Sequence, residues 1–149
     1  MDQEKQIIDL LKTNACTKQQ VYRETKSVFA EFQKQLKNKL LVINKEILDK
    51  KVKVEYSSDG DFEVKLKFSG DTLLFHMHSN IFDFNAAHPI HKTNYVKEDK
   101  LRSFCGVINI YNFLSDSFKY NRLNDAGYLI ARVFINKDKH FFVEGDKQL

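Results

Sequence analysis

The chain has 149 residues, of which 42% are hydrophobic and 30% are charged, with a net charge of +4. These are ordinary globular values, so they exclude a disordered chain and fit one domain over residues 1–149. Within that domain we expect a helical part over residues 1–50 and a sheet-forming part over residues 51–149.

The first residues predict a short helix followed by a second helix start. Asp2 can cap a helix over residues 3–13, and Asn14 and Ala15 are expected to end it. Thr17 and Gln20 then fit a capping box, in which the two side chains bond to free backbone N–H groups. The sequence therefore predicts that the chain leaves the first helix before residue 17.

The second helix carries apolar residues at steps of three and four from Val21 to Ile47, with no Gly or Pro between them. A helix over residues 18–49 would be roughly 48 Å long, whereas a compact chain of this size is about 40 Å across. Either the helix bends or breaks near Asn38 or Asn44, or one end projects and a second copy covers its apolar stripe. A homo-oligomer formed through the long helix is therefore one of two alternatives.

After Lys50 the spacing of apolar residues changes from three and four to two, which marks a change from helix to sheet. Strict alternation and turn residues predict six to seven strands, mostly antiparallel and joined as hairpins in a meander. The expected strands are residues 52–56, 62–68, 72–78, 81–84, 104–113, 128–135 and 140–143. The predicted fold is α+β, with the N-terminal helices packed on this sheet. The charged stretch 92–102 and the polar segment 115–125 are expected to lie between strands.

Seven lysines between residues 34 and 53 stand against Glu46 and Asp49, so this stretch has a local surplus of five positive charges. Such a strip can follow the phosphates of a nucleic acid. Lysine without arginine gives no bidentate contact to bases. A solvated helix face explains the pattern more simply, and we expect no nucleic-acid partner.

Four histidines and an aspartate lie close together in the sequence. Imidazole is the commonest transition-metal ligand, and side chains two apart on a strand share a face. The candidate metal ligands are His76, His78, Asp83, His88 and His91. If Leu73, Phe75 and Met77 face the core, His76 and His78 face away from it. Half-exposed strand histidines without a cofactor are then the alternative to a transition-metal site.

The second half of the chain combines aromatic residues with polar ends and arginines, a mixture suited to a pocket for a small anionic or planar ligand. The candidate ligand-binding residues are Tyr111, Tyr120, Arg122, Tyr128 and Arg132. Alternation predicts that Tyr128, Ile130, Arg132 and Phe134 share one face of their strand.

No stretch of the chain carries a motif specific for one reaction. The five glycines are scattered, so no phosphate-binding loop is formed, and Cys105 lies in an apolar strand where cysteine is usually inert. We therefore expect a non-catalytic binding or interaction module, with a metal-binding protein or metal-dependent enzyme as the alternative. Its contact surface would be the sheet face opposite the helix, or the helix stripe itself.

The cellular location is indicated by what the sequence does not contain. No apolar run approaches the ~20 residues that cross a bilayer, and the first residues lack the pattern of a secretory signal. Cys16 and Cys105 are far apart and form no CxxC pair. We expect a cytoplasmic protein with reduced thiols and no membrane partner.

Overall fold

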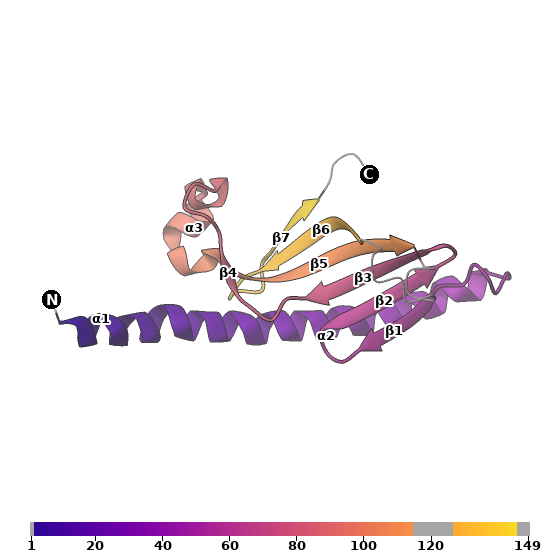
Figure 1. Cartoon of the computed structure of the whole chain (residues 1–149), viewed down its shortest axis with the longest axis horizontal. Helices are drawn as coiled ribbons and strands as arrows, with labels where there is room; N and C mark the ends of the chain where they lie inside the picture. The colour runs from indigo at the N-terminus through magenta and orange to yellow at the C-terminus, as the bar shows by residue number, and fades with distance from the viewer. Residues whose placement is uncertain (1, 115–126, 146–149) are drawn as a thin grey trace.

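Figure 1 shows a long helix that runs along one face of an antiparallel sheet. The structure is a computed structural model that describes residues 2–114 and 127–145. Its helical elements are α1 (Gln3–Leu10), the π-helical segment η1 (Leu11–Ala15), α2 (Cys16–Glu46), the 3-10 turn η2 (Pro89–Lys92), α3 (Asn94–Glu98) and the 3-10 turn η3 (Lys100–Ser103). Its strands are β1 (Glu55–Asp59), β2 (Glu63–Phe68), β3 (Asp71–Met77), β4 (Phe82–Asp83), β5 (Phe104–Leu114), β6 (Tyr128–Ile135) and β7 (Phe141–Gly145). The predicted α+β class is confirmed.

The N-terminal part is one continuous helix, because α1, η1 and α2 follow each other without a gap over 44 residues. The predicted end at Asn14 and Ala15 is wrong: both residues lie in η1. A π-helical turn takes up an extra residue without breaking the helix, and no Gly or Pro is present to stop it. Thr17 does not cap a new helix but is buried within α2.

The predicted break near Asn38 or Asn44 is also wrong, since both residues lie inside α2. Asn44 keeps its helical backbone and uses its side chain instead. Its Nδ2 donates to the Val54 carbonyl oxygen and its Oδ1 accepts from the Val54 N–H, both at 2.9 Å. The helix is therefore long enough that its N-terminal end extends past the sheet in Figure 1, and α1 has no buried residue.

The sheet is a meander in the order β1-β2-β3-β5-β6-β7, antiparallel throughout, with β4 paired to β5 beside it. The predicted strands are found within a few residues of their expected ends, except that β1 begins at Glu55 rather than at residue 52. The charged stretch 92–102 is not a plain loop, because it contains α3 and η3. The segment 115–125 lies outside the described residues.

The core lies between α2 and one face of the sheet. Phe29 and Phe32 of α2 stack at 6.2 Å, and the Phe32 ring lies 5.1 Å from that of Phe75 on β3. Phe75 and Met77 are buried against this helix as part of the main apolar cluster. Because side chains alternate along a strand, His76 on β3 points to the other side of the sheet, the orientation expected if Phe75 and Met77 face the core. We call that side, opposite α2, the open face.

Candidate functional site

The open face carries a polar row that crosses four strands. Paired residues on neighbouring strands lie side by side on the same face of a sheet. Asn109 on β5 pairs with His76 on β3 and with Arg132 on β6, and Arg132 pairs with Glu144 on β7. The chain thus brings four polar side chains from distant parts of the sequence into one line.

An apolar row lies next to this polar row. Val107 on β5 pairs with Phe134 on β6, and Phe134 pairs with Phe142 on β7. On the other side of the polar row, Tyr111 pairs with Leu129. The polar groups of the open face are therefore bordered by apolar surface on both sides.

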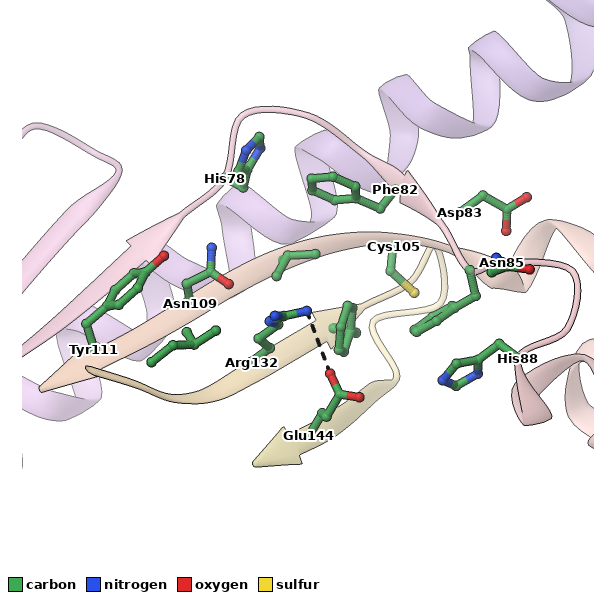
Figure 2. A pocket seen from close by; sticks show the side chains of 14 residues that line it. His78, Phe82, Asp83, Asn85, His88, Cys105, Asn109, Tyr111, Arg132 and Glu144 are labelled. Atoms are coloured by element: carbon green, nitrogen blue, oxygen red, sulfur yellow. Dashed lines mark ion pairs between the residues drawn. The ribbon is translucent and has the colours of Figure 1, made fainter. Parts of the chain in front are cut away.

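A cavity of about 450 Å³ lies over these rows. We call it the open-face pocket, and Figure 2 shows the side chains that line it. They are His78, Phe82, Asp83, Phe84, Asn85, His88, Cys105, Val107, Asn109, Tyr111, Leu129, Arg132, Phe134 and Glu144. Its floor comes from β5, β6 and β7, and one wall comes from β4 and the residues that follow it.

Aromatic packing holds that wall against the floor. The Phe84 ring lies 4.9 Å from the ring of Phe134 and 4.6 Å from that of His88. Polar contacts also fix the chain at Asp83 and Phe84. The Phe84 carbonyl oxygen is 3.0 Å from Nε2 of His91, and Asp83 accepts a 2.6 Å hydrogen bond from the Ser103 hydroxyl. The helical turns η2 and η3 thus position the wall.

The polar end of the pocket contains a loosely paired arginine. Nη1 of Arg132 lies 3.9 Å from Oε2 of Glu144, and both side chains are about half exposed, at 48% and 53%. An exposed ion pair at this distance contributes little to stability. Figure 2 shows both side chains at the pocket, joined by this contact. Arg132 is therefore a cation in the pocket that is not strongly held by its neighbour.

Cys105 lies in the pocket but is a poor nucleophile. Burial, followed by the negative charge of Asp83, raises the pKa of the Cys105 thiol to about 12. The thiolate is the reactive form of cysteine. At neutral pH this thiol is protonated, so it contributes apolar surface rather than chemistry.

Four of the predicted metal ligands make polar contacts with neighbouring groups: His78, Asp83, His88 and His91. Nδ1 of His78 accepts from the Asn80 N–H at 3.0 Å, and its ring lies 4.9 Å from that of Phe82. Nδ1 of His88 accepts from the Ile90 N–H at 3.1 Å and so caps η2. His91 lies within this 3-10 turn, so both histidines belong to local helical structure.

The five predicted ligands do not converge on one point, although the ring centroids of His76 and His78 are 6.4 Å apart. His76 sits in the polar row beside Asn109, while His91 bonds to the Phe84 carbonyl oxygen. Across residues 2–114 and 127–145, no three His, Cys, Asp or Glu side chains form a group that could hold a metal ion. His78, His88 and Asp83 line the pocket as polar and aromatic surface.

Two of the predicted ligand-binding residues, Tyr111 and Arg132, line the pocket. Tyr128 does not line it: this residue is 63% exposed and pairs with Asn112 in a row on the helix side of the sheet. A β-bulge is the cause, since Ile110 pairs with Ala131 but Tyr111 pairs with Leu129. The skipped residue shifts the alternation along β6. Tyr120 and Arg122 lie outside the described residues.

Sequence reasoning missed Phe82, Phe84 and Glu144. The sequence could have indicated Glu144, because a hairpin with its turn at residues 136–139 pairs Glu144 with Arg132. The two phenylalanines had no such signal, since only the tertiary fold lays β4 over the apolar row.

Comparison of the chain with models of protein families, with curated proteins and with solved structures finds no match. Among the described residues, no helix combines the length and the apolar character needed to span a bilayer. The function is therefore inferred from the chemistry of the pocket.

Proposed function

We propose that this protein is a non-catalytic binding module that holds a small planar ligand in the open-face pocket. The observation that carries this proposal is the aromatic wall of β4, which closes over an apolar floor and leaves a cavity of about 450 Å³. Ligand sites are typically clefts of about 300–1,000 Å³ with apolar linings and a few polar groups. The volume of the open-face pocket lies in this range, and seven of its fourteen lining residues are apolar or aromatic.

The reactive groups of the pocket support binding rather than catalysis. The Cys105 thiol, whose pKa is raised to about 12, is protonated at neutral pH. Nδ1 of both His78 and His88 is already bonded to a backbone N–H. These groups are arranged to shape the pocket, and Asn109, Tyr111 and Arg132 supply its polar contacts.

Titration with N-phenylnaphthylamine, an uncharged planar fluorophore, tests the proposal. We expect saturable binding with increased fluorescence. Phe82→Ala removes part of the wall and should weaken binding roughly fivefold, as expected for loss of about 1 kcal/mol of apolar contact. Phe82 is exposed on a two-residue strand, so the variant is expected to fold.

Phe141→Ala is the matched control. Phe141 is 74% exposed and lines a second, apolar groove of about 140 Å³ between α2 and β6. This variant should leave the affinity for the probe unchanged. If Phe141→Ala weakens binding and Phe82→Ala does not, the probe sits in the second groove and the proposal is wrong.

A second candidate function is self-association through the two ends of the long helix. Apolar side chains are exposed at both ends: Ile7 and Leu11 at one, Leu41 and Val42 at the other. Exposed apolar groups of this kind favour contact with a partner. Residues 2–12 carry two lysines against three acidic residues, a net charge of −1, whereas residues 34–53 carry a surplus of five positive charges.

These charges favour a second copy in antiparallel orientation. The N-terminal end of one helix would then lie against the C-terminal end of the other, in a two-fold symmetric contact that joins opposite charges. Sedimentation at tens of micromolar should show a dimer. Ile7→Ser combined with Leu11→Ser should give a monomer without loss of fold, because neither α1 nor η1 has a buried residue. A monomeric wild type, or equal dissociation by Val143→Ser on β7, would contradict this candidate.

A further inference from the structure

We infer that Arg132 selects ligands that carry an anionic group, and that Glu144 is the internal carboxylate which such a ligand displaces. This inference rests on the proposed function of the open-face pocket and deepens it. The ligand class is a planar molecule with a carboxylate, sulfonate or similar anion at one end.

Arg132 is not committed to a structural role. Arg102, which does have one, provides the comparison within the same chain. Its Nε donates to Asp138 at 3.1 Å, its Nη1 donates to the Tyr95 carbonyl oxygen at 2.9 Å, and its guanidinium lies 4.2 Å from the centre of the Tyr95 ring. Within residues 2–114 and 127–145, the polar contact of the Arg132 side chain is the 3.9 Å ion pair with Glu144, so among these residues most of its N–H donors have no partner and could bind a ligand.

The neighbours of Arg132 suit a planar anion. A guanidinium presents a planar fork of N–H donors that matches two anionic oxygen atoms. Asn109 lies beside Arg132 in the same row and offers an amide donor. Phe134 lies two residues further along β6, and its ring packs against Phe84 in the wall of the pocket. A ligand ring lying on this wall would place its anion near Arg132 and Asn109.

Glu144 would repel the same anion if its carboxylate stayed in place. It lies on β7, the last strand of the described sheet, and its side chain is 53% exposed. The carboxylate can therefore turn toward solvent at little cost. Glu144 keeps Arg132 paired when the pocket is empty and weakens binding of an anion by competing for the guanidinium.

The test uses two probes that share one planar skeleton. Anilinonaphthalene sulfonate carries an anion, and N-phenylnaphthylamine does not. Arg132→Gln should weaken binding of the sulfonate by roughly tenfold and leave the uncharged probe unchanged. Glu144→Gln should tighten binding of the sulfonate several-fold, again without effect on the uncharged probe. Arg23→Gln, an equal charge change on the exposed side of α2, is the control and should alter neither affinity.

The outcomes separate this inference from the proposed function. If Arg132→Gln changes both probes equally or changes neither, the pocket binds ligands but does not select anions. If Glu144→Gln weakens the sulfonate, Glu144 is not a competitor and the second half of the inference fails. If neither probe binds the wild-type protein at all, the proposed function itself is wrong.

Discussion

Replacing Gly106 with alanine tests how closely the long helix lies on the sheet. Gly106 is on β5 and pairs with Ile135, a core residue on the helix side. A Cβ atom at position 106 would lie 2.1 Å from Oγ1, 2.6 Å from Cγ2 and 2.7 Å from Cβ of Thr25 on α2. Thr25 is completely buried, and its hydroxyl donates to the Val21 carbonyl oxygen at 2.7 Å. The threonine cannot turn away, so helix and strand must separate.

The cost of this separation can be bounded. Overpacking a well-packed core typically costs about 1–3 kcal/mol, and a clash with three atoms at once places Gly106→Ala at the upper end. Replacing a strand glycine with alanine regains roughly 0.5–1 kcal/mol by restricting the unfolded chain. The net loss of unfolding free energy should be about 2 kcal/mol, which lowers Tm by roughly 4–8 °C for a chain of this length.

Urea denaturation followed by circular dichroism measures this loss. Gly70→Ala is the matched control, because a Cβ atom there meets nothing within 4 Å; its unfolding free energy should be unchanged or slightly raised. Thr25→Ala removes two of the three clashing atoms, so in a double-mutant cycle it should partly suppress the effect of Gly106→Ala. If Gly106→Ala and Gly70→Ala unfold at the same urea concentration, α2 does not pack on β5 as described.

Three further predictions concern single side chains. Alkylation of the native protein at about pH 8 should modify Cys16, which is exposed, and spare Cys105, whose pKa is raised to about 12 by burial; mass spectrometry showing equal labelling would contradict this. Asn44→Ala should lower the unfolding free energy by about 2 kcal/mol by leaving the Val54 N–H and carbonyl without partners, whereas Asn38→Ala, exposed on the same helix, should not. The hydrogen bond from Lys137 lowers the pKa of Asp99, so Asp99 stabilises the fold above its unfolded pKa of about 4, and that contribution is lost as the pH falls through the folded-state pKa. The unfolding free energy of Asp99→Asn should therefore fall less steeply below about pH 4 than that of the wild type. If urea titrations show the same fall for both proteins, the assignment is wrong.

Local spacing determined which backbone segments form strands and which form helix. The alternation in residues 62–68 and 72–78 placed β2 and β3 within a residue or so of their actual ends. Alternation also implies that Phe75 and Met77 share one face of β3, and both are buried in the core beside the helix. These features depend on side chains two or four residues apart, which is the range that a sequence pattern reports directly.

The helix boundaries were harder to predict, because capping patterns compete with continuation. Thr17 and Gln20 fit a capping box, yet Thr17 is buried inside α2. The packing of α2 on the sheet supplies more stability than an early cap, so the helix runs through. Asn44 has a low helix propensity and so favours a break, but the helix continues and its side-chain amide bonds to Val54 ten residues later.

The sequence by itself determined the two kinds of backbone and their order, because these follow from the period of apolar residues. Only the tertiary structure decided the site. Arg132 and Glu144 meet across a hairpin, a bulge turns Tyr128 away from the pocket, and the helical turns after β4 hold Phe84 against Phe134. These features depend on strand register and on where the chain reverses. The spacing of neighbouring residues encodes neither the register nor the reversal.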